Sequence, residues 1–137
     1  MTRFVDVHVH PPTERFLDVT LAPFVPGLGR AGHPLDTASV DELAEHYRSR
    51  DGRAVLLGWD AETATDAPPL SSAHVADLVR AHPDVFVGFG SVDPHKGAKA
   101  ISGVAEAKRL GLVGLAFHPA VQRFDPSDRR LGSIWEV

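Results

Sequence analysis

The residues of this chain whose types and spacing best suit chemistry are Asp6, His8 and His10. Alternate side chains of a β-strand point to the same face, so an extended segment here would place all three on one face. Two imidazoles that leave the end of a strand side by side can bind one zinc ion, at about 2.0–2.1 Å from each ring nitrogen. We therefore predict that His8 and His10 bind a divalent metal ion, with zinc preferred. Asp6 would lie behind them and orient an imidazole or a neighbouring strand.

A His-x-His pair alone is a weak signal, because the chain has 8 histidines in 137 residues. Chance alone gives roughly 0.5 such pairs per chain of this composition, and requiring Asp two residues earlier lowers that to about 0.04. Position at the end of a predicted strand favours the metal site further. The alternative is an exposed edge strand whose polar face meets solvent.

Four short apolar runs predict the strands that would position these side chains, at residues 4–9, 54–59, 85–92 and 112–117. The last three are almost continuously apolar or glycine, which is typical of parallel strands covered by helices. The valines of the first run would pack outward on helices, and its polar face would point inward. Helices are predicted from Ser39 to about residue 50, at 72–81 and at 98–110. Ser39 and Glu42 form a capping box for the first of them.

Strand followed by helix, repeated about every 30 residues, is the unit of the (β/α)8 TIM barrel. We predict an α/β fold of this type, with residues 1–137 forming about the first four βα units, the N-terminal half of one domain. Residues 11–38 are rich in Pro and Gly and would form a substrate loop after the first strand. A second capping box, with Ser133 at the N-cap and Glu136, predicts one more helix. The alternative is a short turn that packs on itself.

The Asp6, His8 and His10 pattern on a first strand resembles the amidohydrolase superfamily. Residues 84–94, 110–119 and 128–136 resemble the third strand, the fourth strand and the next helix of its amidohydrolase-related branch, which includes aminocarboxymuconate-semialdehyde decarboxylase. The resemblance covers about the first half of that fold. It implies further metal-binding histidines on strands five and six and a catalytic aspartate on strand eight, beyond Val137.

The resemblance leaves the reaction open. It implies hydrolysis of an amide, ester or lactone by metal-activated water, or non-oxidative decarboxylation on the same metal site. A third reading is an inactive fragment, because two histidines are fewer than the three protein ligands of a catalytic zinc site. A phosphoesterase would need basic residues near the site to bind phosphate, and the predicted strand ends offer none clearly.

Five further residues are candidates for substrate binding: His118, Trp59, Asp93, Arg30 and His33. His118 and Asp93 follow predicted strands and Trp59 ends one, where barrel active sites form. Arg30 and His33 lie in the long loop after the first strand. Each also has a structural interpretation. His118 could be an ordinary loop residue, Trp59 a packing residue, and Asp93 a cap for the loop at Pro94. The remaining histidines read as surface or packing residues (His46, His74 and His82) or as part of a solvated loop (His95 with Lys96).

Composition excludes several classes of protein. Lys and Arg number 14 against 18 Asp and Glu, which gives a net charge of −4 and argues against nucleic-acid binding. With 0 cysteines the chain has no disulfides, thiolate ligands or thiol nucleophile, and this fits a cytoplasmic location. No run approaches the roughly 18 apolar residues of a membrane span. We therefore expect a small-molecule substrate, and the two unpaired strand edges of half a barrel favour homo-oligomers.

Overall fold

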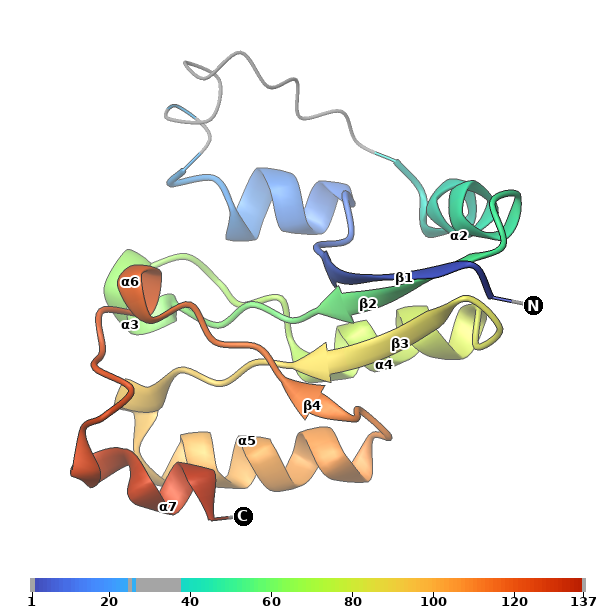
Figure 1. Ribbon diagram of the computed structural model, residues 1–137. Helices are drawn as coiled ribbons and strands as arrows, with labels where there is room; N and C mark the ends of the chain where they lie inside the picture. The colour runs from blue at the N-terminus through green and yellow to red at the C-terminus, as the bar shows by residue number, and fades with distance from the viewer. Residues whose placement is uncertain (1, 25, 27–37, 137) are drawn as a thin grey trace.

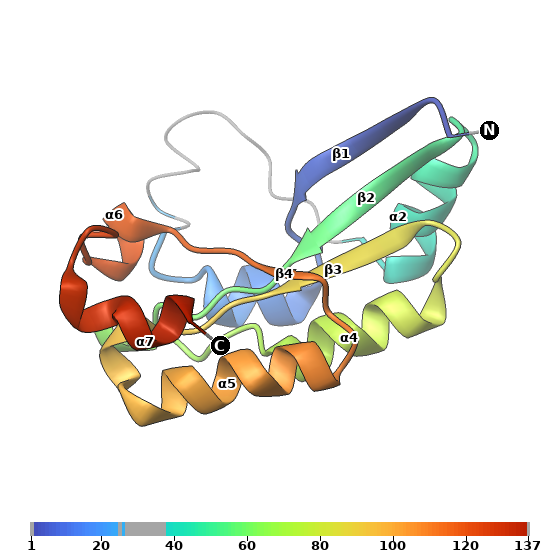
Figure 2. The ribbon, with the colours of Figure 1, turned by 60° about the horizontal axis from the view of Figure 1, so that its bottom comes forward.

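A four-stranded parallel sheet forms the centre of the molecule in the computed structural model, which describes residues 2–24, 26 and 38–136 (Figure 1). The strands lie in the order β1-β2-β3-β4 and each pairs in parallel with the next. Their bounds are β1 Phe4–Val9, β2 Gly52–Leu57, β3 Phe86–Gly90 and β4 Gly114–Leu115. The sheet curls with its helices as one half of a TIM barrel does, which confirms the predicted fold class (Figure 2).

Three longer helices cover one side of this sheet: α2 (Val40–Arg48), α4 (Ser72–Ala81) and α5 (Ala98–Arg109). Helix α2 packs on β2, α4 packs on β2 and β3, and α5 packs on β3 and β4. Figure 2 shows α4 and α5 side by side along the outside of the curl. The connections contain short helical segments: η1 Arg15–Thr20, α3 Glu62–Thr65, η2 Pro94–Lys96, α6 Pro119–Gln122, η3 Arg129–Leu131 and α7 Gly132–Trp135.

The helix starts follow local hydrogen bonding. Ser39 and Glu42 form the predicted capping box at α2, with both of its hydrogen bonds present. At the C-terminus the prediction of Ser133 as an N-cap is wrong, because α7 begins at Gly132 and has no side-chain cap. The 3₁₀ turn η3 runs directly into α7, so the backbone is already helical before Ser133 is reached.

β2 is shifted along the chain from its predicted position, and β3 and β4 are shorter than predicted. β2 begins and ends two residues earlier than residues 54–59, since Trp59 forms an antiparallel bridge with Leu70 instead of continuing the strand. β4 has 2 residues where six were predicted at 112–117. Gly114 and Leu115 pair with the end of β3, the N–H groups of Val113 and Ala116 on either side also donate to β3 carbonyl oxygens, and the chain then turns toward α6.

β1 does not alternate strictly between two faces, so the predicted shared face is wrong for Asp6, whereas His8 and His10 lie together. Its pairing with β2 shifts between Asp6 and Val9, where one extra residue enters β1 as a bulge. Asp6 accepts hydrogen bonds from the Tyr47 hydroxyl of α2 (2.9 Å) and from the backbone N–H of His8 (3.1 Å). Burial and the contact with Asp6 raise the pKa of Tyr47 to about 12.

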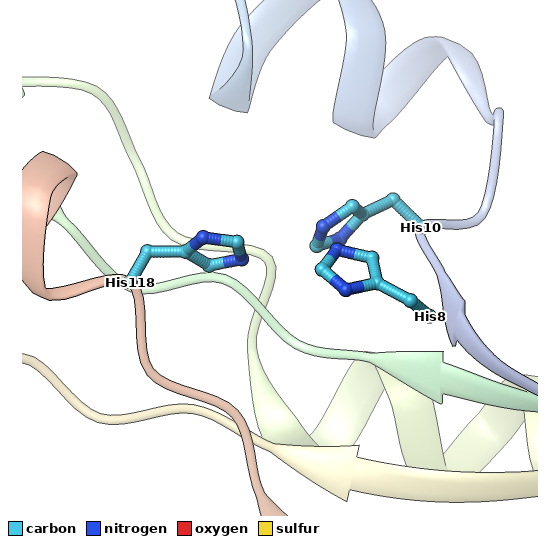
Figure 3. A group of neighbouring side chains, drawn as sticks. All are labelled: His8, His10 and His118. Atoms are coloured by element: carbon cyan, nitrogen blue, oxygen red, sulfur yellow. The ribbon is translucent and has the colours of Figure 1, made fainter.

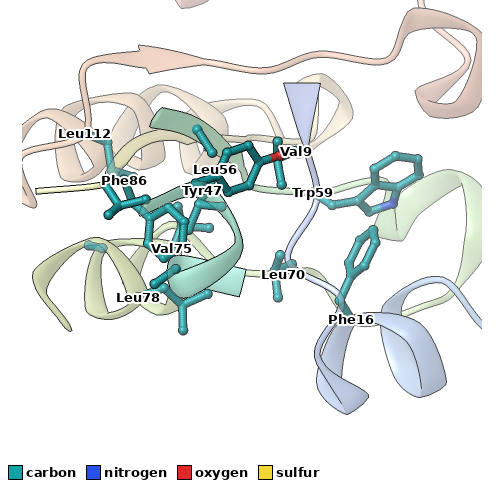
Figure 4. Packing of buried hydrophobic residues seen from close by; sticks show 14 of the residues in the cluster. Val9, Phe16, Tyr47, Leu56, Trp59, Leu70, Val75, Leu78, Phe86 and Leu112 are labelled. Atoms are coloured by element: carbon teal, nitrogen blue, oxygen red, sulfur yellow. The ribbon is translucent and has the colours of Figure 1, made fainter. Parts of the chain in front are cut away.

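The valines of β1 also depart from the predicted alternation of faces. Val9 is buried, but Val5 and Val7 are 52% and 69% exposed, so only Val9 packs on the helices as predicted. Most of the apolar core lies between the sheet and α2, α4 and α5 (Figure 4). Leu56, Val75 and Phe86 are each at most 1% exposed within it.

One glycine sets how closely β2 and β3 approach at their carboxyl ends, and its replacement tests the fold. A Cβ at Gly58 would lie 3.0 Å from the Ser91 nitrogen and 3.1 Å from the Gly90 carbonyl carbon. Since backbone cannot rotate away as a side chain can, Gly58→Ala should lower the free energy of unfolding by about 1–3 kcal/mol, as measured by urea denaturation.

Gly132→Ala is the matched control, because a Cβ there meets nothing within 4 Å and the residue is helical. Its free energy of unfolding should change by less than about 0.5 kcal/mol or rise slightly. Equal stability of the two variants would contradict the close approach of β2 and β3.

Candidate metal centre

Three imidazoles meet at the carboxyl ends of the outer strands of the described sheet. They belong to His8 and His10, at the end of β1, and to His118, which follows β4 (Figure 3). One donor nitrogen from each ring lies within 4.8 Å of the other two. The ring centroids are 5.2 Å apart for His8 and His10, and each of these rings is 5.7 Å from His118.

The curl of the sheet explains why β1 and β4 reach one place. Neighbouring strands lie about 4.8 Å apart, so in a flat sheet the first and fourth strands would be roughly 14 Å apart. The imidazoles of His10 and His118 are much closer than that. No sequence pattern gives this proximity, because it depends on curvature accumulated over four strands. His118, predicted as a substrate contact, thus joins the two predicted metal ligands.

Aromatic side chains surround the imidazole group on one side. The ring of His10 stacks on Phe16 of η1 at 5.0 Å and meets Trp59 edge-on at 5.3 Å. The Trp59 indole also lies 4.6 Å from the His118 ring and 5.9 Å from Phe24. Trp59 is only 8% exposed, which confirms that it packs in the core. Its ring also borders the imidazole group, and its contact with substrate stays a prediction.

This environment keeps two of the imidazoles neutral. Burial, followed by the neighbouring His8 and His118, lowers the pKa of His10 to about 4. Burial and then His8 also lower the pKa of His118. A neutral imidazole has a free lone pair, which is the form that binds a metal ion.

The side chains present suit a divalent metal ion. Three imidazoles are a donor set that zinc uses. In a tetrahedral zinc site, the ligand nitrogens lie about 3.4 Å from one another. His10 Nδ1 is also buried without a hydrogen-bond partner among the described residues, a state that costs free energy unless a ligand is bound. Small rotations of the rings would bring donors that already lie within 4.8 Å to that spacing.

The side chain of Asp93 is used in hydrogen bonds within the fold, and its predicted contact with substrate stays a prediction. Its side chain is 1% exposed and accepts hydrogen bonds from the backbone N–H groups of Thr63 (2.8 Å) and His95 (2.9 Å). Burial alone would raise the pKa of Asp93, but these hydrogen bonds outweigh it and the pKa is lowered. The alternative prediction, a cap for the loop at Pro94, is confirmed, because Asp93 is the N-cap of η2.

The segment of His95 and Lys96 is not a simple solvated loop, which corrects an expectation from the sequence. Lys96 Nζ lies 2.7 Å from Asp60 Oδ1 and 2.8 Å from Glu62 Oε2, and the pKa of Lys96 is raised because these carboxylates outweigh its burial. The His95 ring lies 2.9 Å from the carbonyl oxygen of Gln122. Both side chains therefore tie together the connections that follow β2, β3 and β4.

The other predicted residues lie away from the imidazole group or are not described. Arg30 and His33 lie outside the described residues. His46 is exposed on α2, and His82 at the end of α4 pairs with Asp41 at 2.8 Å, as expected of surface or packing residues. His74, on α4, is half-buried. Within residues 2–24, 26 and 38–136, no helix has the length and apolar character that crossing a membrane requires.

The lowered pKa of His10 makes stability depend on pH. An unfolded histidine has a pKa of about 6.5, so between that pH and about pH 4 the unfolded chain binds a proton at residue 10 that the folded chain does not. Stability should therefore fall as the pH is lowered through this range, by on the order of 1–3 kcal/mol.

Urea denaturation at several pH values in the presence of a chelator measures this effect. His10→Phe keeps the stacking on Phe16 but cannot titrate, so its stability should fall less between pH 6.5 and 4. The same pH dependence in both proteins would contradict a buried, neutral His10.

Comparison with known proteins bears on the fold alone. No known family profile matches the chain, and no curated protein sequence matches it. Among solved structures, the chain is similar to the uncharacterized TIM-barrel protein Bb4693 from Bordetella bronchiseptica, with a TM-score of 0.73 and 22% sequence identity. The similarity covers 96% of this chain and 50% of that protein, so the chain spans half its length. The four parallel strands and their helices therefore have the fold of half a TIM barrel.

Proposed function

We propose that this protein is a metal-dependent hydrolase that acts on an amide, ester or lactone bond of a small organic substrate. The observation that carries the proposal is the group of three imidazoles, whose donor nitrogens lie within 4.8 Å of one another. Its position also supports the proposal, because active sites of TIM barrels lie at the carboxyl ends of the strands. The Asp6, His8 and His10 pattern supports a place in the amidohydrolase-related branch of the amidohydrolase superfamily.

The three imidazoles would hold the ion from one side. A divalent ion such as zinc, when bound, polarises a substrate carbonyl and lowers the pKa of a water molecule to about 7. His10 and His118 both have lowered pKa values, so each offers a free lone pair at pH 7 without first losing a proton. His8 is the exposed member of the group and leaves the outer side open to substrate.

Trp59 and Phe16 would act as an apolar wall beside the imidazoles. Both are buried, and both contact the His10 ring. Such a wall keeps water away from the inner side of His10 and lowers the local dielectric constant, which strengthens the interaction of a carbonyl oxygen with a cation. We propose that the apolar part of the substrate lies against the accessible edge of Trp59, next to His118.

Metal binding tests the site directly. The purified chain should bind one zinc ion in isothermal titration calorimetry, and His8→Asn, His10→Asn and His118→Asn should each weaken binding. The expected loss is more than about 100-fold, because removing a ligand costs more than the 10–100-fold typical of an outer-shell change. His46→Asn is the matched control, since that histidine is exposed on α2, away from the group, and its variant should bind zinc as the wild type does. Binding that survives loss of any two of the three imidazoles would contradict the site.

Turnover tests the reaction. Hydrolysis of a panel of small esters, lactones and amides should disappear with a chelator, return with zinc and be lost in the same three variants. Release of CO2 from aromatic carboxylic acids, with no hydrolysis of the panel, would overturn the proposed hydrolysis in favour of non-oxidative decarboxylation.

A further inference from the structure

A buried glutamine near the imidazole group bonds through all of its polar atoms and carries no acid–base chemistry of its own. Gln122 ends α6 and its side chain is buried, with 3% exposure for the residue. Its Oε1 accepts a hydrogen bond from the backbone N–H of His118 (2.7 Å). Its Nε2 donates to the carbonyl oxygens of Asp60 (2.7 Å) and Val92 (2.9 Å). Both N–H donors and the acceptor of this amide are therefore used.

These three hydrogen bonds connect the ends of three strands. Asp60 follows β2, Val92 follows β3, and His118 follows β4. One buried amide thus fixes the His118 backbone relative to the rest of the sheet. It adds to the pairing of β4, which has only 2 residues and is continued by the hydrogen bond from the Ala116 N–H to the Gly90 carbonyl oxygen (2.8 Å).

The segments that Gln122 joins are themselves held by further hydrogen bonds. The side chain of Asp60 accepts hydrogen bonds from Lys96 Nζ at 2.7 and 2.9 Å and from the backbone N–H of Asp93 at 3.2 Å. The backbone carbonyl of Gln122 lies 2.9 Å from the His95 ring. Gln122 therefore joins His118 to a rigid polar network.

Helix α6 cannot supply this rigidity alone. It has 4 residues and ends at Arg123, whose φ is +56°. A helix of one turn is unstable by itself, so contacts outside the helix must hold it. The amide of Gln122 reaches back from the end of the helix to its N-cap residue, His118, and also reaches the two neighbouring strand ends.

We propose that Gln122 is a positioning residue for the metal site: it holds the His118 imidazole beside those of His8 and His10. This inference rests on the proposed function and adds to it the residue that assembles the third ligand. Gln122→Met keeps the length of the side chain and removes all three hydrogen bonds. Gln122→Glu keeps an acceptor for the His118 N–H but places a carboxylate against two carbonyl oxygens.

The first experiment needs no metal. Hydrogen exchange of the His118 amide, followed by NMR in the metal-free chain, should be at least about tenfold faster in Gln122→Met, because its acceptor is lost. Leu78→Ala is the control for general loss of stability, since Leu78 is buried on α4 away from this network. In Leu78→Ala, the His118 amide should exchange as slowly, compared with the neighbouring amides, as it does in the wild type. Wild-type protection of His118 in Gln122→Met would overturn the inference.

The second experiment counts ligands. Pulsed EPR of the chain with one equivalent of Cu²⁺ should detect three coordinated imidazoles in the wild type and in Leu78→Ala, and two in Gln122→Met and in Gln122→Glu. The metal affinity of both Gln122 variants should fall by about tenfold or more. If either folded Gln122 variant still coordinated the ion through three imidazoles, the inference about Gln122 would be overturned and the proposed function would not. A wild type that binds no metal would overturn the proposed function, and the exchange of the His118 amide would still decide whether Gln122 positions that residue.

Discussion

The curl of the parallel sheet is the constraint on which the imidazole group depends. β1 and β4 do not pair with each other, yet the histidines that follow them meet because β2 and β3 between them are twisted and packed on an outer layer of helices. The close approach at Gly58 and the buried core under β2 and β3 maintain that curvature. Chemistry at the carboxyl ends is therefore linked to packing on the opposite side of the sheet.

Two kinds of interaction hold the site from different sides. An apolar wall of Phe16 and Trp59 lies against His10, and burial together with the neighbouring His8 and His118 lowers the pKa of His10 to about 4. A polar network holds the loop of His118, through Gln122 and the ion pair of Asp60 with Lys96. The apolar side sets the protonation state of a ligand, whereas the polar side sets where a ligand lies. Both are needed, since a metal site requires neutral donors at defined positions.

The sequence was sufficient for the parts of the fold that depend on local patterns. Continuous apolar runs predict the parallel strands, and the capping box at Ser39 predicts the start of α2, because strand burial and capping act within a few residues. The pairing of His8 with His10 follows from their spacing. The nearness of His118 does not, since it arises from curvature. Neither does the buried state of Asp93, because one of its partners, Thr63, lies on the connection after another strand. Gln122 gives no signal in the sequence, because a lone glutamine has no pattern.

The bulge in β1 divides that strand into two parts with separate tasks. Before it, Asp6 is bonded to Tyr47 and serves the contact with α2; after it, His8 and His10 serve the imidazole group. In a strictly alternating strand, any change in how the wall helix sits would rotate the donors as well. With the extra residue, one six-residue strand joins the outer helix layer to the candidate site, turning a carboxylate toward the former and two imidazoles toward the latter.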